Sequence, residues 1–231
     1  MWIDNESFFH TASTNDIVLF GDGEIACFVN SCSANKVVLR VENSGVITNG
    51  TSLNIKGKTV NHFYISEHEL TAIKNILIDF PISIVLSFVE SKDNIEWAKK
   101  EFVGAHEIVP KIETLQSLQN LEEIINSTHM LFIGRGDLSL AVGIEKIGII
   151  QRRIITVSHQ FGCKVCVGTG VLDSLRWSET PLRSEIIDIT NSFLENVDII
   201  VLTSETGGAN DPFKAIRYLN LVIDYLKSLD S

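Results

Sequence analysis

A lysine and a glutamate lie two positions apart in the segment Val109-Pro110-Lys111-Ile112-Glu113. Because side chains alternate between the two faces of a strand, Lys111 and Glu113 should point to the same side. A second segment, Gly134-Arg135-Gly136-Asp137, ends in another carboxylate. If the two segments end neighbouring parallel strands, which lie about 4.8 Å apart, Glu113 and Asp137 can converge on one hard cation. Two carboxylates leave coordination positions open for water and substrate oxygens, as Mg²⁺ prefers.

Each of these groups also has an ordinary structural explanation. A carboxylate after a strand is often a helix cap, and a single lysine is often a surface residue whose stem covers apolar atoms. The combination favours a site, because a lysine that faces the inside of a barrel needs an anionic partner. The glycines on both sides of Arg135 would also let backbone N–H groups approach an anionic ligand closely.

The elements that position these groups follow a β/α pattern. From about residue 62 onward, short apolar runs alternate with helical periodicity, which predicts units around a parallel sheet. Thr169 closes the fourth expected strand and Ser204-Glu205-Thr206 closes the fifth, so both should join the same edge of the sheet. Five units are three short of a closed barrel of about eight. The strands are expected at residues 84–89, 107–113, 130–137, 164–169 and 198–205.

Several sequence signals predict where helices begin and end. Ser66 and Glu69 form a capping box, and Ser91 can cap a helix that runs through Trp97. Gly162 should end a helix that begins near Ile149. Asp211 and Pro212 open the last helix, as its cap and first position, and its amphipathic pattern is that of an outer barrel helix.

The first 60 residues predict a different kind of structure. Short β runs are expected at residues 16–20, 25–30, 36–42 and 46–49, and the turn sequences Gly21-Asp22-Gly23 and Asn43-Ser44-Gly45 separate them. We interpret residues 1–60 as a small antiparallel β module and residues 61–231 as a partial β/α barrel that carries the site.

Composition excludes several classes of function. The 231-residue chain has 29 acidic and 19 basic side chains, and its net charge of −10 disfavours nucleic acid and anionic membranes as partners. No apolar run has the length of a membrane span, and the first residues lack the pattern of a signal peptide, so we expect a cytoplasmic protein.

The four cysteines and six histidines do not suggest a metal centre. Cys163 and Cys166 are three positions apart on an expected strand, so they face opposite sides and cannot bind one metal ion. The histidines are scattered, without the spacing of a ligand set. We therefore interpret the cysteines as small buried apolar residues.

A series of short motifs follows one order along the chain. The motifs are Gly21-Asp22-Gly23, Leu53-Asn54-Ile55-Lys56-Gly57, Ser87-Phe88-Val89, Lys111-Ile112-Glu113, Gly136-Asp137-Leu138, Gly168-Thr169, Leu172-Asp173-Ser174, Pro181 to Glu185, and Ser204-Glu205-Thr206 followed by Pro212. Their types and order resemble the pyruvate kinase family. The resemblance extends from about residue 14 to the last helix.

The resemblance implies roles for individual residues. Lys111 matches the lysine that moves a proton at the enolpyruvate carbon, and Glu113 and Asp137 match the carboxylates that hold Mg²⁺ or Mn²⁺. Thr169 matches the hydroxyl beside the transferred group, which places it with Lys111 among the catalytic residues. The backbone of residues 134–137 matches the cradle of the substrate carboxylate. The implied substrate-binding set is Ser87, Gly134, Arg135, Gly136, Asp137 and Thr169.

The departures from the family concern mainly phosphoryl transfer. The resemblance implies that the first three barrel strands, with the substrate-phosphate arginine and monovalent-cation ligands, and the carboxyl-terminal regulatory domain have no counterpart here. Asn49-Gly50-Thr51 stands where the family usually has lysines near the nucleotide phosphates. Gly170, Ser139 and Leu182 also replace family residues.

These matches and departures lead to one expectation and two alternatives. We expect a Mg²⁺-dependent enzyme that acts on pyruvate, phosphoenolpyruvate or a related 2-oxo acid through an enolate, as in aldol chemistry or decarboxylation. The first alternative is pyruvate kinase activity completed by a partner chain, and the second is a non-catalytic scaffold. Because an open parallel sheet exposes two edges, we also expect a homo-oligomer or a complementing partner chain.

Overall fold

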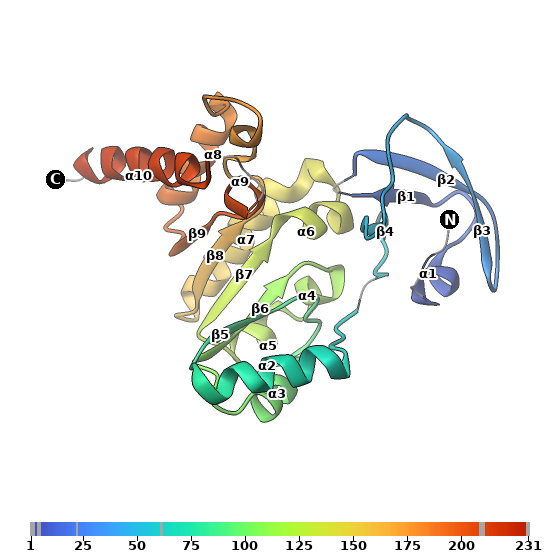
Figure 1. Cartoon of the computed structure of the whole chain (residues 1–231), viewed down its shortest axis with the longest axis horizontal. Helices are drawn as coiled ribbons and strands as arrows, with labels where there is room; N and C mark the ends of the chain where they lie inside the picture. The colour runs from blue at the N-terminus through green and yellow to red at the C-terminus, as the bar shows by residue number, and fades with distance from the viewer. Residues whose placement is uncertain (1–2, 4–5, 22, 61, 208–210, 230–231) are drawn as a thin grey trace.

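Two separate β-sheets organise the chain, one antiparallel and one parallel (Figure 1). The computed structural model describes residue 3 and residues 6–21, 23–60, 62–207 and 211–229. The antiparallel sheet forms the N-terminal part of the molecule, and the parallel sheet with its helices forms the remainder. The predicted fold class, a partial (β/α) barrel preceded by an antiparallel β module, is confirmed.

The antiparallel sheet has the strand order β3-β2-β1-β4. Its strands are β1 (Ile17–Phe20), β2 (Ile25–Ser33), β3 (Lys36–Val41) and β4 (Leu53–Ile55), and helix α1 (Glu6–Thr11) precedes them. Phe8 of α1 is fully buried in the apolar cluster of this sheet. Of the predicted turn at residues 21–23, Asp22 lies outside the described residues.

The predicted strand at residues 46–49 is wrong, because the fourth strand is β4. Residues 46–49 form an exposed loop, and Val46 keeps 84% of its surface exposed. Their β propensity has no effect there, because nothing covers one face of the segment. In contrast, β4 pairs with β1 and buries Ile55 completely.

The parallel sheet has the strand order β5-β6-β7-β8-β9. Its strands are β5 (Ser83–Leu86), β6 (Glu107–Ile112), β7 (Met130–Gly134), β8 (Lys164–Gly168) and β9 (Ile199–Val201). Each strand pairs in parallel with the next in the sequence, as right-handed β/α units do. Within the described residues the sheet stays open, with β5 and β9 at its edges.

Several strands end earlier than the sequence pattern predicts. The third expected strand stops at Gly134, so Arg135, Gly136 and Asp137 form the first turn of a helix instead. The fifth spans only Ile199–Val201, and residues 204–207 are helical. The apolar run sets where a strand lies, but the chain turns into the next helix as soon as it leaves the covered part of the sheet.

The helices follow the strands in the order expected for β/α units. Capping side chains mark several ends: Ser66 and Glu69 form the predicted capping box, and Asp211 accepts a hydrogen bond from the N–H of Phe213. The helical segments are α2 (Glu67–Asp79), α3 (Lys92–Glu101), α4 (Leu115–Gln119), α5 (Leu121–Ile125), α6 (Arg135–Val142), η1 (Ile144–Lys146), α7 (Ile147–Gln160), η2 (Asp173–Arg176), α8 (Arg183–Leu194), α9 (Ser204–Gly207) and α10 (Pro212–Leu229).

Two of the predicted helix ends differ in detail. The helix after Ser91 runs beyond Trp97 to Glu101, and Oδ1 of Asn94 accepts from the N–H groups of Glu90 and Ser91. The helix expected near Ile149 begins at Ile147, and Gly162 follows its end with a left-handed φ of +69°.

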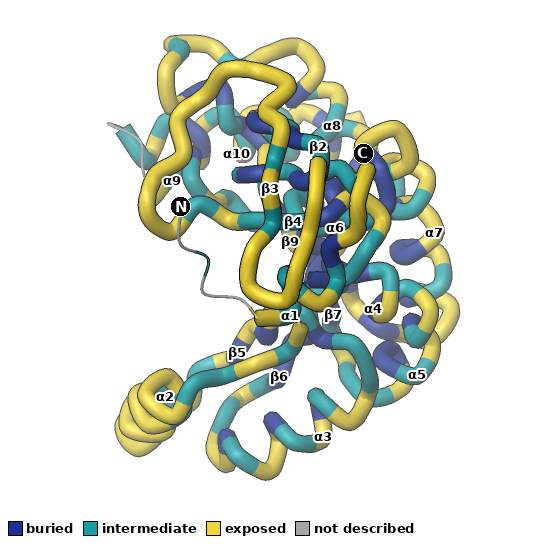
Figure 2. Tube along the Cα trace, turned by 90° about the vertical axis from the view of Figure 1, so that its right-hand side faces the viewer, coloured by how far each residue is buried: buried dark blue, intermediate teal, exposed yellow. Residues whose placement is uncertain are grey.

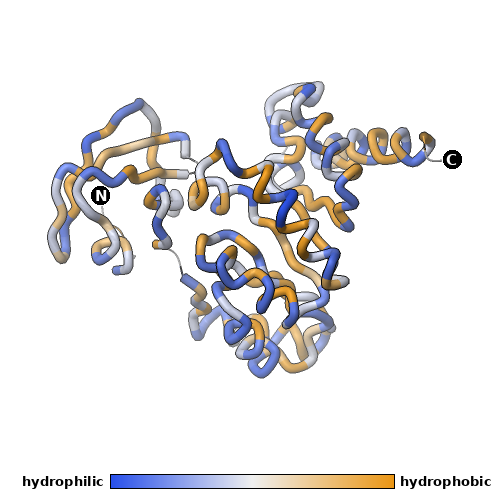
Figure 3. Tube along the Cα trace, turned by 180° about the vertical axis from the view of Figure 1, so that it is seen from behind, coloured by the Kyte–Doolittle hydropathy of each residue, from blue (hydrophilic) through white to orange (hydrophobic). Residues whose placement is uncertain are grey.

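The main apolar core lies between the parallel sheet and the helices that cover it. It is built from β5 to β8 and from α3, α5, α6 and α7. Figure 2 shows buried positions gathered in these strands and helices, whereas α2 and β3 are mostly exposed. Figure 3 shows the C-terminal helix α10 extending away from the sheets. Its exposed apolar residues include Leu221 and Tyr225.

Candidate active site

A lysine and a glutamate form a close ion pair at the carboxyl ends of β5 and β6. Nζ of Lys111 lies 2.5 Å from Oε1 of Glu113 and donates to Oγ of Ser87 at 3.3 Å. The same ammonium group lies 5.6 Å from the ring centre of Phe132. The backbone N–H of Phe88 donates to the other Glu113 oxygen at 3.0 Å. The strand alternation predicted that Lys111 and Glu113 share a face, and the structure places them in contact.

Burial governs the electrostatics of Glu113. Only 2% of the side chain is exposed, and this desolvation raises the pKa of the carboxyl group above its ordinary value. The nearby Lys111 ammonium, its hydrogen bond and the N–H of Phe88 oppose the shift, whereas the charge of Asp137 adds to it. The two carboxylates therefore oppose each other's charge.

Gly134 allows Glu113 to occupy this position. A Cβ atom at residue 134 would overlap the carboxyl group of Glu113. Glycine is therefore required at this junction between β7 and α6, because the Glu113 carboxyl group lies too close to the backbone for any side chain. Sequence reasoning assigned this glycine to a backbone anion cradle, and its contact with Glu113 was not predicted.

Asp137 lies in the first turn of α6, directly after β7. Its Oδ1 accepts a hydrogen bond of 3.2 Å from Nδ2 of Asn54, which belongs to β4 of the antiparallel sheet. The N-terminal N–H groups of α6 receive no side-chain cap from Gly134. The N–H groups at the start of a helix favour an anion, and a cradle in residues 134–137 stays a prediction.

The side chain of Arg135 points away from this cradle. Its Nε donates to the carbonyl oxygens of Gly168 (3.1 Å) and Thr169 (3.0 Å), and one Nη donates to Thr169 at 2.6 Å. The other Nη forms a two-pronged ion pair with Asp188 at 2.7 and 2.9 Å. Arg135 thus holds Thr169, whose φ of +73° is unusual for a β-branched residue. No sequence pattern predicted a role for Asp188.

The groups after β9 are tied to the scaffold. Oγ of Ser204 donates to Asp173 of η2 at 2.9 Å. Glu205 is fully buried, and its Oε2 accepts from the N–H (2.9 Å) and hydroxyl (3.0 Å) of Thr203. Oε1 of Glu205 has no hydrogen-bond partner among the described residues. The bond from Ser204 joins α9 to η2, and the bonds to Glu205 hold the turn between β9 and α9.

A buried glutamate also organises the loop after β8. Glu185 accepts from the N–H (2.8 Å) and hydroxyl (2.5 Å) of Ser174 and from the N–H of Leu182 (2.8 Å). The side chain therefore joins η2 to the start of α8. Ser174 and Glu185 belong to motifs in the sequence, but their mutual contact was not predicted.

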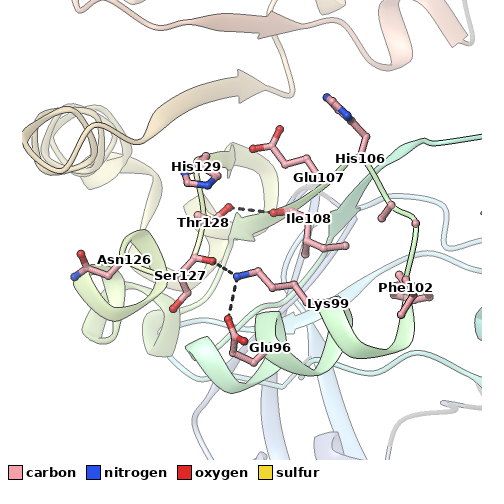
Figure 4. Close-up of a pocket in the computed structure, with 13 residues that line it drawn as sticks. Glu96, Lys99, Phe102, His106, Glu107, Ile108, Asn126, Ser127, Thr128 and His129 are labelled. Carbon is pink, nitrogen blue, oxygen red and sulfur yellow. Dashed lines mark hydrogen bonds and ion pairs between the residues drawn. The ribbon is translucent and has the colours of Figure 1, made fainter.

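A cavity of about 560 Å³ lies at the opposite ends of the strands. Its wall comes from α3, from the segment between α3 and β6, from the amino end of β6 and from the turn before β7, as Figure 4 shows. Nζ of Lys99 is already bonded there to Glu96 (2.9 Å) and to the carbonyl oxygen of Ser127 (2.8 Å). The cavity is distinct from the Lys111 site.

Metal-binding side chains are sparse in the structure. No group of three or more His, Cys, Asp or Glu side chains is placed to hold a metal ion in residues 6–21, 23–60, 62–207 or 211–229. The two carboxylates of Glu113 and Asp137 still suit Mg²⁺, which commonly takes one or two protein carboxylates and fills its other positions with water and substrate. The tight space at Gly134 fixes one of these ligands, and Asn54 holds the other.

The pKa of Glu113 predicts how cation binding depends on pH. Binding requires the carboxylate, so the affinity for Mn²⁺ should fall as the pH is lowered through the raised pKa of Glu113. A Mn²⁺ titration followed by electron paramagnetic resonance between pH 5 and 8 measures this. An affinity that stays constant across this range would contradict the prediction.

The same shift predicts the pH dependence of stability without metal. Because burial raises the pKa in the folded state, the native chain holds the proton to higher pH than the unfolded chain. The contribution of Glu113 to stability is therefore fully present when the pH is below the pKa of this group in the unfolded chain. It is lost as the pH rises through the pKa of the group in the folded chain. Urea unfolding in EDTA should show this fall for the unaltered chain but not for Glu113→Gln. Parallel pH profiles for the two proteins would contradict it.

The four free cysteines should differ sharply in reactivity. Burial raises the pKa of Cys163 to about 12 and that of Cys166 to about 11, whereas Cys32 is exposed. Since the thiolate is the reactive form and needs to be accessible, a thiol reagent at pH 8 should modify only Cys32 quickly in the native protein. Cys32→Ser should abolish that fast phase. A fast phase that persists in this variant would overturn the prediction.

Comparisons with known proteins agree with this fold. A model of the pyruvate kinase barrel domain matches residues 1–216. The chain is 31% identical over 229 residues to pyruvate kinase of Thermoplasma acidophilum, which covers 97% of this chain and 42% of that protein. It is also 30% identical over 226 residues to pyruvate kinase of Pyrobaculum aerophilum, and this alignment covers 96% of this chain and 49% of that protein. The crystal structure of the latter enzyme matches with a TM-score of 0.85 over 94% of this chain and 50% of that chain.

An open parallel β/α sheet with lysine and carboxylates at its strand ends defines a protein built as part of an α/β barrel. The matches identify that barrel, and the chain belongs to the pyruvate kinase family. It spans about half the length of the curated relatives that it matches. The described helices include none that is long and apolar enough to cross a membrane.

Proposed function

We propose that this protein is a Mg²⁺- or Mn²⁺-dependent enzyme that acts on pyruvate, phosphoenolpyruvate or a related 2-oxo acid through an enolate. The observation that carries the proposal is the Lys111–Glu113 ion pair beside Asp137. A partly exposed lysine and two carboxylates at strand ends combine a group that moves protons with ligands for a hard cation. The family relationship supports the same substrate class.

The residues of this chain take the following roles in the proposal. Nζ of Lys111, once deprotonated, accepts a proton from the methyl carbon of pyruvate and returns it to the enolate. Glu113 and Asp137 hold the cation, which when bound would supply positive charge for the enolate oxygen. The N–H groups at the start of α6 bind the substrate carboxylate. Ser87 orients the Lys111 ammonium, and Thr169 lies on the β8 side of the site.

A second candidate function is phosphoryl transfer between phosphoenolpyruvate and ADP. The relatives in the comparisons are pyruvate kinases, which favours this function, and the open edges of β5 and β9 leave room for further strands. Asn49-Gly50-Thr51, in place of basic residues, argues against nucleotide binding by this chain alone. Kinase activity should therefore require a complementing chain. A third candidate, a non-catalytic scaffold, would keep its biological role in Lys111→Ala.

The proposal includes the organisation of the protein and its location. We propose that residues 1–60 and 61–231 are separate units, and that the protein acts in the cytoplasm. The exposed apolar side chains Val85 on β5 and Ile199 on β9 lie at the two sheet edges. Because exposed edges pair readily, a homo-oligomer or a complex with a complementing chain is expected. Sedimentation at micromolar concentration tests this, and a monodisperse monomer would contradict self-association.

The enolate proposal is tested by exchange of the pyruvate methyl protons in D₂O, followed by NMR. The unaltered protein with Mg²⁺ should exchange these protons faster than buffer with Mg²⁺, and EDTA should remove the difference. Boiled protein serves as the control for exchange catalysed by free metal. Rates equal to that control with and without EDTA would contradict the proposal.

A further inference from the structure

One side chain of the antiparallel sheet reaches the candidate metal site. Nδ2 of Asn54 in β4 donates to Oδ1 of Asp137 at the start of α6, across 83 residues of sequence. Figures 1 and 2 both show β4 beside α6. The hydrogen bond is partly shielded from water, which strengthens it relative to an exposed one.

The position of Asn54 is fixed by its own sheet. Asn54 pairs with Leu19 of β1, and the next residue, Ile55, is buried at 1% exposure in the core of that sheet. Lys56 continues the pairing, because its N–H donates to the carbonyl oxygen of Ile17 at 2.9 Å. The backbone that carries the Asn54 amide is therefore held in place by its own sheet.

A second contact joins the antiparallel sheet to α6. Gly23 has a φ of +98°, and a Cβ atom built there would lie 3.2 Å from a methyl group of Leu140. Leu140 lies in α6, one turn after Asp137. The sheet thus meets the first turn of α6 through Asn54 and the next turn through Gly23.

The hydrogen bond leaves Asp137 able to bind a cation. A carboxylate has about four acceptor sites, and Asn54 uses one of them on Oδ1. Carboxylates that bind metals are commonly oriented by a hydrogen bond from an outer partner, and loss of that partner typically weakens metal binding by about 10–100-fold. An amide donor suits this role because it adds no charge to the site.

We propose that Asn54 is a positioning residue that orients the carboxylate of Asp137 for a divalent cation. The inference rests on the proposed metal site at Glu113 and Asp137. The linkage is reciprocal: if this hydrogen bond strengthens cation binding, the cation must strengthen the hydrogen bond by the same factor. The two directions can be measured separately.

Binding of Mn²⁺, followed by the loss of its free electron paramagnetic resonance signal, measures the first direction. Asn54→Leu keeps the size of the side chain and removes the donor, and Asn54→Ala provides a second variant. Both should bind Mn²⁺ at least about 10-fold more weakly than the unaltered protein. Asn49→Ala, at an exposed position in the loop before β4, is the matched control and should bind normally.

Hydrogen exchange of the β1 and β4 amides measures the second direction. Mn²⁺ should slow exchange in the unaltered protein and in Asn49→Ala, but not in Asn54→Leu. If Asn54→Leu keeps metal-free protection of these amides, its sheet is folded and its weaker binding reflects the lost hydrogen bond.

The outcomes separate the two proposals. If the unaltered protein binds Mn²⁺ and Asn54→Leu binds it within twofold, the inference is overturned while the metal site stands. Equal slowing of exchange by Mn²⁺ in both proteins would also overturn it. If the unaltered protein does not bind Mn²⁺, the proposed metal site and this inference fall together.

Discussion

Replacing Lys111 by methionine should slow metal-dependent exchange of the pyruvate methyl protons by about 10²- to 10⁴-fold, the usual contribution of a positioned acid or base. Methionine keeps the length of the side chain and cannot carry a proton. Its effect should lie in the rate at saturating pyruvate, because the ligands of the proposed cation are retained. Exchange measured by NMR in D₂O gives that rate directly.

Two control variants make the Lys111→Met result specific. Lys164→Met changes an exposed lysine at the start of β8 and should leave exchange unchanged. Lys111→Met/Glu113→Gln removes both charges of the pair, including the buried one of Glu113, so it should recover stability lost in Lys111→Met without recovering exchange. Undiminished exchange in Lys111→Met would show that another group moves the proton.

Gly134→Ala should weaken Mn²⁺ binding by at least about 10-fold and lower the free energy of unfolding by about 1–3 kcal/mol. The new Cβ would overlap the carboxyl group of Glu113, and that group is held by Lys111 and by the N–H of Phe88. Because Glu113 is 2% exposed, it has little space to move without losing one of these bonds. Mn²⁺ titration and urea unfolding in EDTA measure the two effects.

Gly148→Ala is the matched control for Gly134→Ala. Gly148 lies in α7, and a Cβ atom there would meet nothing within 4 Å. This substitution should raise the free energy of unfolding by up to about 1 kcal/mol, because alanine is the better helix former. It should leave Mn²⁺ binding unchanged. If Gly134→Ala behaves like Gly148→Ala, the close packing of Glu113 against residue 134 is not required for the site.

The sequence could predict the features that depend on local periodicity. The alternation of a strand was enough to place Lys111 and Glu113 on one face, and the structure brings their charged atoms to 2.5 Å. The β/α rhythm predicted the order of the parallel strands. The capping box at Ser66 and the cap at Asp211 were also predicted, since each is a short-range interaction.

The features that depend on tertiary packing were not predictable in this way. Residues 46–49 have a β-forming sequence but remain a loop, because no strand among the described residues pairs with them. Asp137 was expected at a strand end and lies in a helical turn. Asn54, which bonds to Asp137, lies 83 residues from it in the sequence. Asp188, which bonds to Arg135, lies 53 residues from it. Spacing along the chain carries no signal for such contacts.

The central claim is that Glu113 and Asp137 jointly bind a divalent cation beside Lys111. An anomalous difference map from crystals soaked in Mn²⁺ and pyruvate tests it most directly. We predict one strong peak within bonding distance of both carboxylates, with the pyruvate carboxylate at the N–H groups that begin α6. A map whose manganese peaks all lie away from Glu113 and Asp137 would contradict the claim.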